Sequence, residues 1–218
     1  MTNEVIITTS AVSLAKQIGE YTSIGQNVVL AVCGIATVTI AALGLKTWRR
    51  QLKGTSEYTK SKEVLKAVYN VRRAFRHVRC AAIYSYEYPE EMRDAVGLKD
   101  EHEHAGTAHV YQQRWNILHE AWGRLEEQLL EAQVEWEEFN EDTITPLWKC
   151  KVELQIAIQD LLDAKKSYGR QAVSPEDGAK RDSILYYGGK DSKHDKFTPE
   201  IEAAIAEFER KLRCHIKK

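Results

Sequence analysis

Residues 28–45 read VVLAVCGIATVTIAALGL, eighteen positions without a charged side chain. A helix rises about 1.5 Å per residue, so about twenty apolar residues cover the roughly 30 Å hydrocarbon core of a bilayer. The uncharged run extends back to Tyr21, which gives it the length of a span. We therefore predict a transmembrane helix over residues 27–46 after an N-terminal tail over 1–26. The alternative is a buried helix of a soluble domain, because Gly, Ala and Thr make the run only moderately hydrophobic.

The charges beside this stretch predict its orientation. Before residue 46 the chain carries only Glu4, Lys16 and Glu20. Basic and aromatic side chains that suit a membrane surface follow directly, namely Lys46, Trp48, Arg49, Arg50 and Lys53. By the positive-inside rule, residues 47–54 form a cytoplasmic juxtamembrane segment that contacts anionic lipid, and the N-terminus lies outside. A cleaved signal peptide has its positive charge before the apolar core, which is the reverse order, so we expect this helix to be retained.

Two further features belong to the N-terminal part. An apolar stripe at helical spacing is formed by Leu14, Ile18, Tyr21 and Ile24, so the tail forms either an interfacial amphipathic helix or an unstructured end. Within the span, small residues recur at steps of three and four: Gly34, Thr37, Ala41 and Gly44. Small residues allow two membrane helices to approach closely, which predicts self-association through this face.

Residues 55–218 are predicted to form a cytoplasmic, all-α domain built as an antiparallel bundle. Apolar residues at helical spacing indicate helices over about 55–83, 107–140, 146–168 and 199–216. The second is the most regular: apolar side chains recur in a heptad pattern at Tyr111, Trp115, Leu118, Trp122, Leu125, Leu129, Ala132, Trp136 and Phe139. Thr145-Pro146, Ser174-Pro175 and Thr198-Pro199 are typical helix starts. The tryptophans, Trp148 included, are expected in the core.

The charge is unevenly distributed. Residues 46–79 hold eleven Lys/Arg and two Glu, whereas residues 87–163 hold nineteen acids and six bases. Opposite charges on neighbouring helices favour one pairing, so we expect these two blocks to lie against each other. A basic stripe so close to a bilayer is poor evidence for nucleic-acid binding.

Candidates for chemistry are few. His102, His104 and His109 with nearby carboxylates offer the ligand types of a zinc site, although their spacing does not align them on one helical face. The dipeptide His194-Asp195 is a weak indication of metal phosphohydrolase chemistry. No phosphate-binding loop, nucleophile elbow or Cys/His zinc spacing occurs, and no cofactor is expected. The four cysteines lie far apart, which argues against a disulfide framework.

The sequence is typical of a single-pass membrane protein whose helical domain presents a surface to a cytoplasmic protein partner, with a possible homo-oligomer formed through the span. Two alternatives remain open. A metal-dependent effector or enzyme would use the three histidines, and a subunit of an oligomeric channel would use the small-residue span.

Overall fold

The computed structural model describes residues 2–94, 97–136, 139, 141–166, 174–188 and 195–216. Within these ranges every regular element is a helix, and Arg93 and Leu98 form one isolated bridge. The chain divides into two compact units, Met1–Thr55 and Ser56–Lys218. The protein is therefore all-helical, with one apolar helical segment near its N-terminus.

Helix α1 runs from Thr2 to Val78 and supplies all described residues of the first unit. From Val29 to Leu52 its large apolar side chains are exposed. Hydroxyls of Thr37 and Thr39 donate to carbonyls four residues earlier, at 2.8 Å, so these polar groups are satisfied within the helix. The sequence predicts a separate helix that begins near residue 55 and ends near residue 83. Instead α1 continues through Gly54 and stops at Val78, and the carbonyls of Cys80 and Ala82 beyond it accept hydrogen bonds from Arg114.

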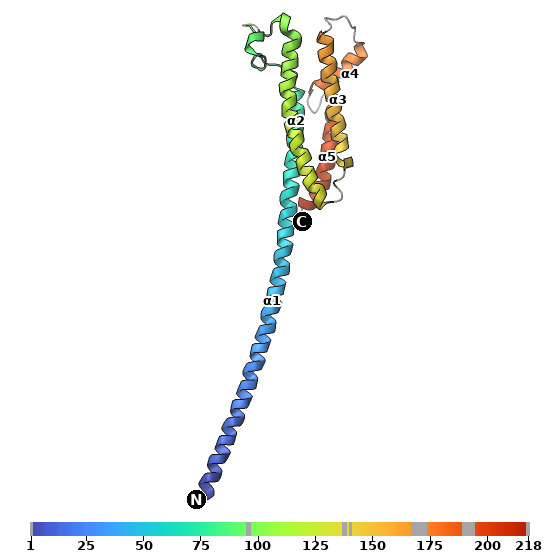
Figure 1. Cartoon of the computed structure of the whole chain (residues 1–218). Helices are drawn as coiled ribbons and strands as arrows, with labels where there is room; N and C mark the ends of the chain where they lie inside the picture. Colours follow the sequence, from blue (N-terminus) through green and yellow to red (C-terminus); the bar gives the residue numbers. More distant parts are fainter. Residues whose placement is uncertain are drawn as a thin grey trace. The chain divides into compact units, whose positions relative to one another are not determined.

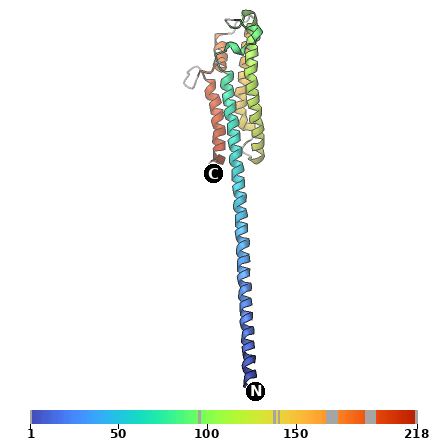
Figure 2. The ribbon, with the colours of Figure 1, turned by 90° about the vertical axis from the view of Figure 1, so that its left-hand side faces the viewer.

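The second unit contains the end of α1 with α2 (Glu103–Glu135), α3 (Glu141–Lys166), α4 (Pro175–Leu185) and α5 (Phe197–Ile216). Figures 1 and 2 show α2, α3, α5 and this part of α1 lying lengthwise beside one another. The connection between α1 and α2 contains three short 3-10 helices, Ser85–Glu87, Glu90–Met92 and Asp100–His102.

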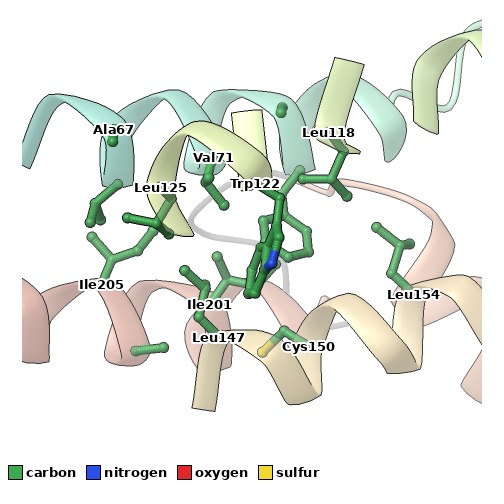
Figure 3. Packing of buried hydrophobic residues seen from close by; sticks show 14 of the residues in the cluster. Ala67, Val71, Leu118, Trp122, Leu125, Leu147, Cys150, Leu154, Ile201 and Ile205 are labelled. Carbon is green, nitrogen blue, oxygen red and sulfur yellow. The ribbon is translucent and has the colours of Figure 1, made fainter. Parts of the chain in front are cut away.

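One hydrophobic core joins these helices. Figure 3 shows Trp122 of α2 at its centre, between Val71 of α1, Leu147 of α3 and Ile201 of α5. Trp122 is 2% exposed, and its indole nitrogen donates to Glu126 at 2.6 Å. Burying large apolar side chains, at about 1.5–3 kcal/mol each, stabilises the packing of helices that carry many charges.

Of the three helix starts predicted at a Ser-Pro or Thr-Pro pair, the structure confirms one and differs at two. Ser174 caps α4, since its hydroxyl accepts the amide of Asp177. By contrast α3 begins at Glu141, which leaves Pro146 inside the helix; the added turn buries Thr143, which accepts a hydrogen bond from Lys211. Helix α5 begins at Phe197, because the carboxylate of Asp195, rather than Thr198, caps its first turn.

The tryptophan prediction also needs one correction. Trp122 and Trp136 are buried and Trp115 packs against the core, but Trp148 is 50% exposed. Trp148 follows the buried Leu147 directly, so on a helix it points about 100° away from the core.

Candidate interaction surface

The most distinctive exposed region lies where α1 and α2 run side by side. Four exposed side chains of α1 recur at steps of four and seven, and four exposed side chains of α2 recur at steps of three and four opposite them. We call these residues the α1–α2 surface: Lys62, Lys66, Arg73 and His77 with Ile117, Glu120, Arg124 and Glu127.

Contacts fix the register of the two helices. Lys60 lies 3.0 Å from Glu135 and 3.5 Å from Glu131. Further along, Arg73 and His77 line the same hollow as Ile117, Glu120 and Arg124. Residue numbers therefore rise along α1 as they fall along α2, which brings Lys62 level with Glu131, Lys66 with Glu127 and Arg73 with Glu120.

This surface is hollowed rather than flat. A hollow of about 640 Å³ follows the two helices from Asn70 to Arg124. A second hollow of about 460 Å³ shares His77 and Ile117 with the first and continues to Tyr84 and Tyr86. The two hollows adjoin at His77 and Ile117, and we refer to them together as the groove.

An exposed aromatic pair stands at one end of the groove. The rings of Tyr84 and Tyr86 stack with centroids 5.5 Å apart and planes 6° apart, although their side chains are 53% and 73% exposed. Ile117 beside them is 48% exposed. Rigid aromatic and aliphatic groups grouped in this way are typical anchors of protein interfaces.

The charges of the α1–α2 surface have no ion-pair partner among the described residues: Lys62, Lys66, Arg73, Glu120, Arg124 and Glu127. Neighbouring positions behave differently. Lys60 pairs with α2, and Arg72 and Arg76 both pair with Glu202 of α5. The expected pairing of the basic and acidic blocks therefore occurs at Lys60, while Arg72 and Arg76 find their carboxylate outside the acidic block.

A buried arginine holds the tyrosine pair in place. Arg114 of α2 is 2% exposed and makes a two-pronged contact with Glu87, at 2.7 and 2.9 Å. Its remaining N–H groups donate to the carbonyls of Cys80 and Ala82. The amide of Tyr84 donates to Glu87 at 2.9 Å. Arg114 thus fixes the backbone from which Tyr84 and Tyr86 project.

A second buried arginine connects three helix ends. Arg79, 1% exposed, follows α1 directly and donates to the carbonyls of Ser183, Ile184 and Tyr186 at the end of α4. It also donates to Asp195 at 2.8 Å and Thr198 at 2.7 Å, at the start of α5.

The carboxylates of both arginine clusters are held in their charged forms. Burial alone would raise the pKa of Asp195, but hydrogen bonds from Thr198, Arg79 and the Gly188 amide outweigh it and lower that pKa. Burial opposes ionisation of Glu87 in the same way, and hydrogen bonds from Arg114 and the Tyr84 amide lower its pKa. Both groups therefore stay ionised and paired at neutral pH.

The predicted metal ligands are not gathered together. His102 lies 3.4 Å from Glu101, and His109 lines the 460 Å³ hollow with His77. Across the described residues, no three His, Cys, Asp or Glu side chains are placed to hold one metal ion. His194 lies outside the described residues, and both oxygens of Asp195 accept hydrogen bonds within the protein. All four cysteines are free.

The residues expected at the membrane lie on α1. Lys46, Arg49, Arg50 and Lys53 are exposed, and Trp48 is 59% exposed. Gly34 and Gly44 have open space where a side chain would project, and Thr37 and Ala41 are exposed beside them. Among the described residues, α1 is the one helix long and apolar enough to cross a membrane. A signal sequence near an N-terminus meets the same criterion of length and composition.

No known family model, curated protein or solved structure matches the chain.

The two buried arginine clusters beside this surface were not predicted from the sequence. Arg79, Arg114 and Glu87 look like ordinary surface charges, and their partners lie 27 to 119 positions away.

Proposed function

We propose that this protein is a membrane-anchored interaction module whose α1–α2 surface receives a protein partner. The apolar segment of α1 holds the chain in the bilayer, with Lys46, Trp48, Arg49, Arg50 and Lys53 at the cytoplasmic headgroups. The second unit, packed as an antiparallel bundle on heptad-spaced apolar residues, lies in the cytoplasm. Self-association through Gly34, Thr37, Ala41 and Gly44 would raise the local concentration of this surface.

The observation that carries the proposal is the groove itself. It combines an exposed aromatic anchor, Tyr84 with Tyr86, and charges that have no partner among the described residues of the chain. A folded surface that served only solubility would not need a buried Arg114 to order its exposed tyrosines. Ordered tyrosines favour partner binding, because pre-organised anchors lose less conformational entropy on association.

Site-specific photocrosslinking tests the proposal. A photoreactive amino acid at Ile117 of the full-length protein, activated in intact membranes, should yield a discrete crosslinked product. The same amino acid at Gln155, an exposed position on α3, should yield far less. Replacing Tyr84 and Tyr86 together with alanine should reduce the Ile117 product about tenfold or more, the loss of one interface anchor. Equal crosslinking at both positions would contradict the proposal.

A further inference from the structure

The α1–α2 surface carries both signs of charge in an ordered arrangement. Its α1 side is basic, through Lys62, Lys66 and Arg73. Its α2 side is mainly acidic, through Glu120 and Glu127, with Arg124 as the exception. The register set by the Lys60–Glu135 contact places each base of α1 at the same height along the bundle as an acid of α2, for example Lys66 beside Glu127. The surface is therefore complementary to a copy of itself.

From this we infer that the partner received by the α1–α2 surface is a second copy of the same chain, related by a two-fold axis parallel to the helices. Rotation by 180° about such an axis keeps every residue at its own height along the helices. It places α1 of one copy against α2 of the other. Lys66 and Arg73 of one copy then face Glu127 and Glu120 of the other, and the same contacts are repeated by symmetry. This inference names the partner of the proposed function and rests on that proposal.

The charges exclude the other face-to-face arrangement. A two-fold axis perpendicular to the helices would turn one copy upside down and place α1 against α1. Lys62, Lys66 and Arg73 would then face basic residues, and like charges across an interface are unfavourable. In the parallel pair the Ser56 ends of both second units lie at the same end of the dimer. Two copies anchored in one membrane require this arrangement.

Apolar groups stand at both ends of the same surface. Tyr84, Tyr86 and Ile117 lie at one end, and Val134, 83% exposed, continues the exposed row of α2 at the other. In the parallel pair Val134 faces α1 of the second copy near Thr59, and Ile117 faces it near His77, so both apolar side chains are covered on association. Burial of apolar area supplies affinity, while the charges select the orientation.

A charge-exchange experiment tests the inference in the full-length protein in lipid nanodiscs. One variant carries Lys66→Glu with Arg73→Glu, which makes its surface acidic. A second carries Glu120→Lys with Glu127→Lys, which makes its surface basic. All four positions are exposed, so the fold should be unaffected. Lys149→Glu with Glu153→Lys, at exposed positions of α3, provides the matched control.

The readout is crosslinking between two differently tagged copies by a photoreactive amino acid at Ile117, which reports this surface rather than the span. Wild type and control should crosslink to a product of twice the chain mass. Each charge variant alone should lose about a hundredfold in self-affinity, because four attractive pairs become repulsive. Mixing the two variants should restore the product, since every pair is then opposite in sign.

Three results would overturn the inference. These are unchanged crosslinking of each variant alone, failure of the mixture to recover, or, when the Ile117 probe is activated in intact membranes, a product containing a different protein. The last would leave the interaction module intact and replace only the partner. Loss of binding to anionic vesicles in the acidic variant, without any change in crosslinking, would assign the basic residues to lipid instead.

Discussion

Two buried arginines determine how the segments between helices are held. Arg79 and Arg114 each bind one carboxylate and at least two backbone carbonyls, so their donors are satisfied in the interior. Such clusters stabilise a fold only when complete, because removing one partner leaves a buried charge or carbonyl unpaired.

Arg79→Ala should destabilise the protein by about 3–5 kcal/mol, because Asp195 would be left buried and unpaired. Arg73→Ala, six positions earlier and exposed, should change stability by less than about 0.5 kcal/mol. Urea unfolding of the full-length protein in detergent, followed by tryptophan fluorescence, compares them. Similar losses for both variants would mean that the Arg79 cluster contributes little.

Acidification should weaken the fold through Asp195 and Glu87. The folded pKa of each is lowered, so their stabilisation is fully present above the unfolded values near pH 4 and is lost as the pH falls through the folded values. Stability measured from pH 6 to 3 should fall steeply below about pH 4.5. Asp195→Asn should be less stable at pH 6 and show a flatter profile below pH 4.5, and parallel profiles would contradict this assignment.

At the scale of elements, the sequence predicted which segments are helical better than where they begin. Apolar spacing in α2 indicated positions that are in fact buried, such as Leu118 and Leu125. The start of α5 was misplaced because its cap, Asp195, is held by Arg79 from 116 positions away. The arrangement of Tyr84 and Tyr86 was likewise not predictable, since it depends on the distant Arg114. The spacing of apolar residues predicts a helix because neighbouring turns repeat it. A hydrogen bond between residues far apart in the chain produces no such repeat in the sequence.

Two glycines of α2 should respond oppositely to alanine. At Gly106 a Cβ would lie 2.5 Å from Leu98 and 3.2 Å from Tyr88, so the connection packed there would have to shift. At Gly123 the same atom meets nothing within 4 Å. Gly123→Ala should stabilise by about 0.5–1 kcal/mol through helix propensity. Gly106→Ala should be less favourable than Gly123→Ala by about 1–2 kcal/mol, through overpacking. Thermal unfolding followed by circular dichroism measures both, and equal shifts in Tm would contradict the close packing of Leu98 on α2.

For the whole molecule, the proposed function depends on the candidate membrane span in α1. The apolar segment of α1 has exposed side chains throughout its described part, an arrangement that suits lipid and not water. The proposed orientation depends on the basic residues that follow it.

Replacing Lys46, Arg49, Arg50 and Lys53 together with glutamine should reduce the fraction of chains with the second unit in the cytoplasm, because it removes the charge asymmetry across the span. Protease protection of a C-terminal tag in sealed vesicles measures that fraction. As a control, Lys60, Lys62 and Lys66 changed to glutamine should have a smaller effect, since they lie farther from the apolar segment. Equal effects would show that the residues next to the span do not determine the orientation.

The most direct test of the account is alkaline carbonate extraction of membranes from cells that express the tagged full-length chain, followed by intact-mass measurement of the retained protein. An anchored module predicts that the chain stays in the membrane fraction with residues 28–45 still attached. Release into the supernatant, or a retained mass that lacks the N-terminal segment, would contradict the account, because the α1–α2 surface would then act without a tether.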